Sequence, residues 1–168
     1  MILADILLWL LIIAGGWLAL TASWLTTFAI APRFTEECRQ RYTTHGIWAV
    51  LIGLITLVPL SIIAIALFRH DPHHPLVRMI ALVIPLSLML MALLGSSGLA
   101  ARVGAGLGSP IDTAQPWRRV MRGGWVLSAS FLMPLVGWFL LLPLTLLSGL
   151  GTTVLVCWRR LYPHAVVA

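Results

Sequence analysis

The densest group of potential ligand residues is a histidine-rich loop. It comprises His70, Asp71, His73 and His74, which are nearly consecutive. Imidazole nitrogens and a carboxylate oxygen are ligands that Zn²⁺ and Cu²⁺ both accept. The segment is short, however, and its prolines restrict how the side chains can converge. We therefore favour a solvated polar loop here, with a metal site at these four residues as the alternative.

The most compact basic cluster is Arg118, Arg119 and Arg122, next to Trp117. Residues three and four apart share a helix face, so we expect the three guanidinium groups on one surface. That surface could contact an anionic lipid headgroup or an acidic segment of a partner. A simpler interpretation is that these arginines only orient the inserted chain. The sequence leaves both interpretations open.

Little in the chain indicates catalysis. Serine and threonine are plentiful, but a serine nucleophile needs an activating base, and no acid–base pair accompanies these hydroxyls. Cys38 and Cys157 form no CxxC motif and no metal-ligand spacing. We predict a protein that is not an enzyme and carries no cofactor, in which the hydroxyls hydrogen-bond within and between helices.

The composition indicates an integral membrane protein. Of the 168 residues, 60% are hydrophobic and 10% are charged, and the mean hydropathy is +1.01. Soluble domains contain about 25% charged residues, so soluble, disordered, collagen-like and disulfide-framework classes are excluded. The net charge is +6, and all eleven basic residues are arginines beside short segments between apolar runs. Their expected partners are membrane lipids, not nucleic acid.

Three apolar runs each fit one transmembrane helix of about 20 residues. They are Ile6–Ile30, Ile47–Phe68 and Met79–Ala101. A further run, Gly124–Trp158, would measure about 52 Å as one straight helix, well beyond the bilayer core of about 30 Å.

We therefore predict a break at Pro134–Gly137, because proline and glycine interrupt helices. The break gives a fourth span, Pro116–Met133, and a fifth, Trp138–Trp158. The expected fold is all-α: one transmembrane domain over residues 1–168, a polytopic helical bundle of five spans whose last two form a tight hairpin. Four spans, or a shallow re-entrant hairpin, are the alternatives.

The arginines predict the orientation. With five spans, nine of the eleven arginines lie on the side of the C-terminus, whereas with four spans the division is seven to four. Positive charge concentrates on the cytoplasmic side of membrane proteins. We therefore expect a multi-pass protein of the bacterial inner membrane, with its N-terminus outside and its C-terminus in the cytoplasm.

The predicted spans have uncharged centres and faces of small residues. Ionisable side chains at membrane depth usually mark ion paths or proton relays, so their absence argues against a pump, a proton-coupled carrier or a haem subunit. Small residues let helix backbones approach closely. We predict helix packing at Ser97, Ala100, Ala101, Gly104, Gly149 and Gly151.

The first predicted cytoplasmic loop contains a helical pattern. Phe34, Cys38 and Tyr42 recur every four residues, while charged and amide side chains face elsewhere. This pattern predicts a short helix lying in the membrane interface. A solvated connector is the alternative.

Several segments resemble one family. They are Pro32-Arg33-Phe34-Thr35-Glu36, Val50–Ala66, Pro134-Leu135-Val136-Gly137-Trp138, and Gly149-Leu150-Gly151 through Trp158-Arg159-Arg160. Together they resemble the multi-span membrane module that accompanies polymer-forming, bactofilin-like β-helical domains in many bacteria. This chain lacks a β-helix repeat, so the resemblance implies a membrane anchor or scaffold whose polymer-forming partner is a separate chain. It implies no catalytic residue.

Taken together, these features predict a non-enzymatic scaffold or accessory subunit of a larger inner-membrane assembly. Its partners would be other integral membrane subunits or a polymer-forming protein, held by helix packing and by the arginine-rich cytoplasmic face. A small channel or carrier for a neutral or lipidic substrate is the alternative, since broken helices and hydroxyls near the midplane occur in transporters.

Overall fold

The computed structural model describes residues 2–70, 75–108, 115–133 and 135–161, and all regular structure in these ranges is helical. The helices are α1 (Ile2–Ile30), α2 (Pro32–His70), α3 (Pro75–Gly106), α4 (Pro116–Phe131) and α5 (Leu142–Leu161). A π-helical turn, η2 (Gly137–Leu141), leads directly into α5. The predicted all-helical class is therefore confirmed for the described residues.

Three of the helices begin with a proline, namely α2 at Pro32, α3 at Pro75 and α4 at Pro116. The first residue of a helix has no intrahelical partner for its N–H, and the proline ring already has a helical φ. Proline therefore costs nothing at these positions and marks where each helix starts.

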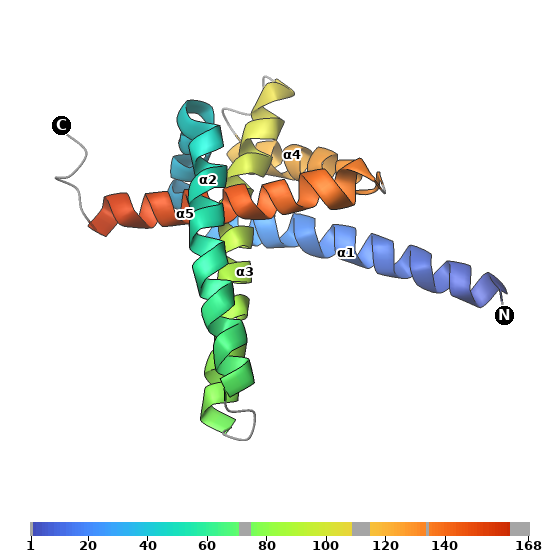
Figure 1. Cartoon of the computed structure of the whole chain (residues 1–168). Helices are drawn as coiled ribbons and strands as arrows, with labels where there is room; N and C mark the ends of the chain where they lie inside the picture. The colour runs from blue at the N-terminus through green and yellow to red at the C-terminus, as the bar shows by residue number, and fades with distance from the viewer. Residues whose placement is uncertain (1, 71–74, 109–114, 134, 162–168) are drawn as a thin grey trace.

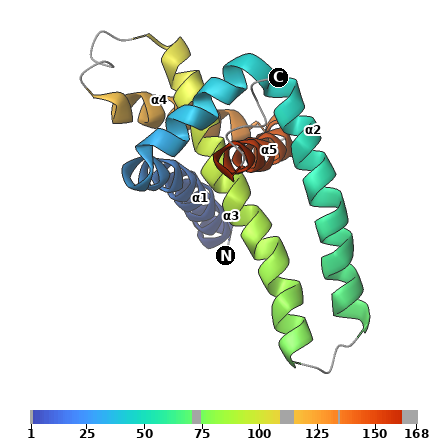
Figure 2. The ribbon, with the colours of Figure 1, turned by 90° about the vertical axis from the view of Figure 1, so that its left-hand side faces the viewer.

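Helix α2 has 39 residues, which corresponds to about 58 Å along a straight axis. This exceeds one bilayer core, and only Gly46–His70 qualifies as a span. Figure 2 shows the helix bending between its first part and this apolar part. We name residues 32–45 the α2 arm. The segment predicted as an interfacial helix or a solvated connector is thus helical and continuous with the following span.

Helices α2 and α3 form an antiparallel hairpin, and α1 and α5 run across it (Figure 1). Figure 2 looks nearly along α5, which lies between α2 and α3. We call this space between the two helices of the hairpin the fork. Helix α4 packs on α3 and α1, while α5 packs on α2 and α3. We call these packed helices the body, and the second half of α3 lies at its centre.

Glycines make the passage of α5 through this fork possible. A Cβ on Gly151 would lie 1.7 Å from the carbonyl oxygen of Ala49 in α2, and one on Gly149 would lie 2.2 Å from that of Ala92 in α3. Residues two apart on a helix point in nearly opposite directions, since each residue turns the helix by about 100°. The two glycines therefore admit one neighbouring backbone on each side of α5.

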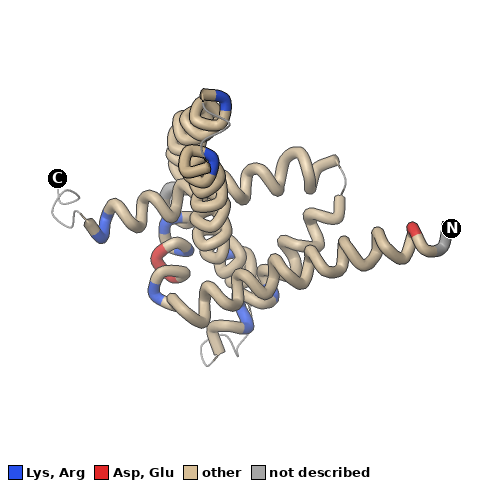
Figure 3. The backbone as a smooth tube through the Cα atoms, turned by 90° about the horizontal axis from the view of Figure 1, so that it is seen from below, with Lys and Arg blue, Asp and Glu red and all other residues tan. Residues whose placement is uncertain are grey.

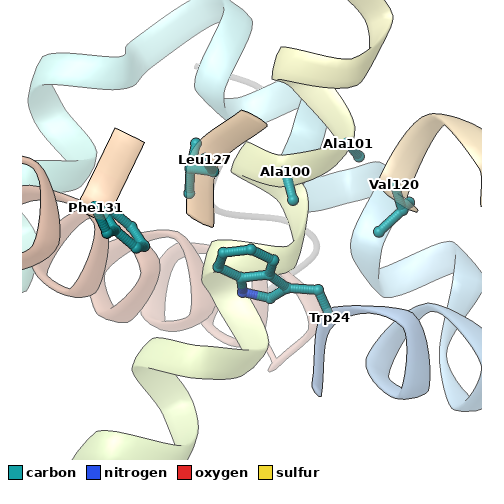
Figure 4. Close-up of a cluster of buried hydrophobic side chains, with 6 residues drawn as sticks. All are labelled: Trp24, Ala100, Ala101, Val120, Leu127 and Phe131. Atoms are coloured by element: carbon teal, nitrogen blue, oxygen red, sulfur yellow. The ribbon is translucent and has the colours of Figure 1, made fainter. Parts of the chain in front are cut away.

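A second crossing joins α3 to α4 and α1. Its apolar cluster consists of Trp24, Ala100, Ala101, Val120, Leu127 and Phe131 (Figure 4). Trp24 is 1% exposed, and its indole Nε1 donates a 2.8 Å hydrogen bond to the Ser96 hydroxyl. Only the second half of α1 takes part, because large apolar side chains from Ile6 to Ile13 are all exposed.

Among the described residues, four helices are long and apolar enough to cross a membrane: Ala4–Ile30, Gly46–His70, Pro75–Gly106 and Gly137–Leu161. The predicted total of five spans is not confirmed. The predicted fifth span, Trp138–Trp158, lies within the candidate span Gly137–Leu161, whereas the predicted fourth span, Pro116–Met133, matches no candidate span. Helix α4 has 16 residues, or about 24 Å, which is short for the bilayer core. The run from Gly124 to Trp158 is interrupted, since α4 ends at Phe131 and η2 begins at Gly137. The predicted tight hairpin is also not confirmed, because α4 packs mainly on α3 whereas α5 packs mainly on α2 and α3.

Candidate functional site on the α2 arm

Charged residues gather where the α2 arm meets the ends of α4 and α5 (Figure 3). Among the described residues, the acidic side chains are Asp5 near the start of α1 and the neighbours Glu36 and Glu37 on this arm. The carboxylate of Glu36 points to α4, and that of Glu37 points to α5. One side of the α2 arm is held to the other helices by ion pairs, and the other side is held by buried packing.

Glu36 binds two arginines. Arg39, one turn further along the arm, donates from both Nε and Nη2, and the Nε–Oε1 distance is 2.8 Å. Arg119 of α4 donates from Nη2 to Oε2 at 2.9 Å. The hydrogen bond from Arg39 and the positive charges of both arginines hold the pKa of the Glu36 carboxyl below its ordinary value of 4.5. The carboxylate therefore stays ionised and ties α4 to α2.

Glu37 binds the last turn of α5. Arg160 donates from Nη2 to Oε1 at 3.0 Å and from Nε to Oε2 at 3.2 Å, a fork of two parallel hydrogen bonds. The same guanidinium lies 5.8 Å from the centre of the Phe34 ring. Both side chains of the pair are about half exposed, so its contribution to stability is small, about 0.5 kcal/mol.

The opposite side of the arm is buried against α3 and α5. Thr35 and Ser97 share a hydrogen bond of 3.3 Å between their hydroxyls, and a Cβ on Gly98 would lie 2.5 Å from the Cβ of Cys38. Tyr42 donates from its hydroxyl to Ser148 of α5 at 3.2 Å. Burial raises the pKa of Cys38 and of Tyr42 to about 12 each, so both stay protonated.

The predicted basic cluster on α4 is divided between different surroundings. Arg118 is exposed and lies 5.4 Å from the centre of the Trp117 ring. Arg119 turns inward to Glu36, and its side chain is 18% exposed. Arg122 is half-buried. Of the three, Arg118 is thus the residue that faces outward with Trp117.

The residues predicted to pack helices all lie in the body. Ser97, Ala100, Ala101 and Gly104 are buried in α3, and Gly149 and Gly151 are buried in α5. A Cβ on Gly104 would lie 1.8 Å from the carbonyl oxygen of Arg119. The small side chains in α3 therefore face α4 as well as the α2 arm.

The histidine-rich loop lies mostly outside the described residues. His70 is exposed at the end of α2, whereas Asp71, His73 and His74 fall in the segment that is not described. Among the residues searched, no three histidine, cysteine, aspartate or glutamate side chains converge on a possible metal position. The solvated loop therefore stays a prediction, and the metal site stays its alternative.

The sequence did not point to Glu36, Glu37 and Tyr42 as residues that connect helices. One signal was present: two adjacent carboxylates in a chain whose other charges are mostly arginine. Their partners Arg119 and Arg160 are 83 and 123 positions away, so pairing could not be inferred without a fold.

Comparison with known proteins found no matching family model, no similar curated protein and no similar solved structure.

Proposed function

We propose that this chain is a non-enzymatic scaffold or accessory subunit of a larger assembly in the bacterial inner membrane. The observation that carries the proposal is the first half of α1. In the candidate span Ala4–Ile30, 6% of the most apolar part is buried, compared with 11% in Gly46–His70, 17% in Pro75–Gly106 and 44% in Gly137–Leu161. Such a helix fits a role in which other membrane helices pack against it.

The glycines support this proposal by contrast. Gly53, Gly95, Gly104, Gly123, Gly149 and Gly151 all approach the backbone of another helix, whereas Gly15 and Gly16 in α1 have nothing within 4 Å of an added Cβ. Small residues in membrane helices allow close approach of a second helix. A helix from another subunit could therefore approach α1 at this pair as closely as the helices of the body approach one another.

Copurification tests the proposal. The tagged chain is purified in mild detergent from its native membrane, and its partners are compared with those of Gly15→Leu/Gly16→Leu. We expect membrane proteins that accompany the wild type and are lost from the variant. Gly106→Leu is the control, because it adds the same side chain at another open position. Recovery of the lone chain, or identical partners for all three proteins, would count against the scaffold.

A polymer-forming partner remains part of this proposal and rests on the resemblance described above. The five-span topology with an external N-terminus is also part of this proposal. It is supported by the division of the arginines nine to two. Reporter fusions after Ala168 and within residues 109–114 test it. Both fusions should report the cytoplasm if five spans are present, and an external C-terminus would contradict the orientation.

A second candidate is a small carrier for a neutral or lipidic substrate. It is favoured by an almost entirely apolar cavity of about 330 Å³ between α2, α3 and the first half of α5. Leu57, Pro85 and Leu146 are among its lining residues. A volume in this range accommodates small ligands. Flux of a fluorescent lipid across proteoliposomes tests this function, and rates equal to those of empty vesicles would exclude it.

A further inference from the structure

A second cavity lies between the α2 arm and the end of α5, and most of the residues that line it are charged or polar. Its volume is about 590 Å³, and it is lined by Glu37, Gln40, Arg41, Thr44, Val156, Arg159 and Arg160. Three guanidinium groups thus face one carboxylate. The cavity lies on a different side of the arm from the Glu36 cluster and shares no lining residue with it.

The charges in this cavity are not balanced. Glu37 is neutralised by its paired hydrogen bonds with Arg160. Within the part of the chain that the structure describes, neither Arg41 nor Arg159 forms an ion pair. Two guanidinium groups therefore carry positive charge that no carboxylate of the described residues offsets through an ion pair. An anion could bind both with charge-assisted hydrogen bonds.

The surroundings of the cavity indicate where this anion comes from. One turn beyond Thr44 on α2, Ile47 is 79% exposed and Trp48 is 61% exposed. Next to Arg159 on α5, Trp158 is 60% exposed. Exposed tryptophans beside a long apolar helix are typical of the lipid headgroup region. The cavity therefore opens beside surfaces that acyl chains would cover.

We propose that this cavity binds the phosphate of an anionic phospholipid through Arg41 and Arg159. Basic pockets between membrane helices commonly bind such headgroups. The hydroxyl of Thr44 donates to the carbonyl oxygen of Gln40 at 3.2 Å, which leaves its oxygen able to accept a hydrogen bond from a headgroup hydroxyl. The acyl chains would then extend along Ile47 and Trp48. This proposal does not depend on the scaffold function.

Native mass spectrometry of the full chain in mild detergent tests the site. Phosphatidylglycerol and phosphatidylethanolamine with identical acyl chains are compared as ligands. We expect preferential retention of phosphatidylglycerol and a loss of about tenfold in its affinity for Arg41→Gln/Arg159→Gln. The matched control is Arg69→Gln/Arg78→Gln, which removes two positive charges at the far end of the α2–α3 hairpin and should change retention less than about twofold.

Several results would overturn the proposal. An equal loss of phosphatidylglycerol in both double variants would indicate general electrostatic attraction. Unchanged retention of this lipid by Arg41→Gln/Arg159→Gln would mean that the two arginines do not bind it, and an acidic protein segment would then be the ligand to test. Full displacement of the lipid by inorganic phosphate would indicate a site for free phosphate. Circular dichroism checks the fold of each variant. If the double variant unfolds, Arg159→Gln alone, which changes an exposed side chain, should still weaken retention about threefold.

Discussion

Arg119 Nη2 on α4 lies 2.9 Å from Glu36 Oε2 on the α2 arm, although 83 positions separate the two residues in the chain. This hydrogen bond joins an arginine that the sequence suggested for an external surface to a carboxylate that the sequence did not single out. The pair is a direct charge contact between α2 and α4.

A double-mutant cycle at Glu36 and Arg119 should show positive coupling. Glu36→Gln leaves two arginines facing a neutral amide, whereas Arg119→Gln leaves Glu36 with Arg39. We expect a coupling free energy of about 1 kcal/mol between positions 36 and 119, because the residues are in direct contact. Thermal unfolding in detergent measures it. The same cycle between Glu36 and Arg160 should be additive, since Arg160 pairs with Glu37 instead.

The pH dependence of stability should report the same carboxylate. The pKa of Glu36 is lower in the folded chain than its ordinary value of 4.5. Its contribution to the free energy of unfolding is therefore complete above pH 4.5 and is lost as the pH falls through the folded pKa. The stability difference between wild type and Glu36→Gln should shrink below pH 4.5. A difference that grows on acidification would contradict the ion pair, and Asp5→Asn is the control.

The four candidate spans could be predicted from the sequence, and their arrangement could not. Length and apolar content identify a helix such as Gly46–His70 regardless of its neighbours. The α2 arm is different, because its helical pattern of Phe34, Cys38 and Tyr42 shows which residues share a face but not what covers it. In the structure, α3 and α5 cover Cys38 and Tyr42, and this requires helices far along the chain to be in place.

For the candidate site, the sequence indicates which residues take part in packing or carry charge, but not which helix each of them contacts. Small residues such as Gly149 and Gly151 indicate close packing of helices, yet the sequence does not say that they face α3 and α2 respectively. The arginines of α4 looked equivalent, since spacing alone places them on one face. They differ in the structure because Arg119 pairs with Glu36, whereas Arg118 is exposed beside Trp117.

Gly151→Ala should destabilise the protein strongly. The new methyl group would lie 1.7 Å from the carbonyl oxygen of Ala49, and a backbone atom within a helix cannot move aside alone. We expect a loss of about 3 kcal/mol in the free energy of unfolding. Gly16→Ala has the same chemistry with nothing within 4 Å, and it should stabilise α1 by about 0.5–1 kcal/mol. Equal effects at the two positions would refute the crossing of α5 and α2.

Cys38 should resist alkylation in the folded protein. Its side chain is fully buried, and burial raises its pKa to about 12, so almost no thiolate forms at neutral pH. In a Cys157→Ala background, iodoacetamide should label Cys38 only after denaturation, as intact mass will show. Rapid labelling under native conditions would mean that the α2 arm detaches from α3 and α5.

The passage of α5 between α2 and α3 also governs how the protein is made. Glu37–Arg160 and Tyr42–Ser148 connect residues 123 and 106 positions apart, so the hairpin is synthesised and inserted long before the helix that fills its fork. Until α5 has been synthesised, Ala49, Gly53, Ala92 and Gly95 lack their contacts with it. Every nascent copy therefore passes through an open intermediate, and a premature stop before α5 would leave that intermediate as the final product for membrane proteases to remove.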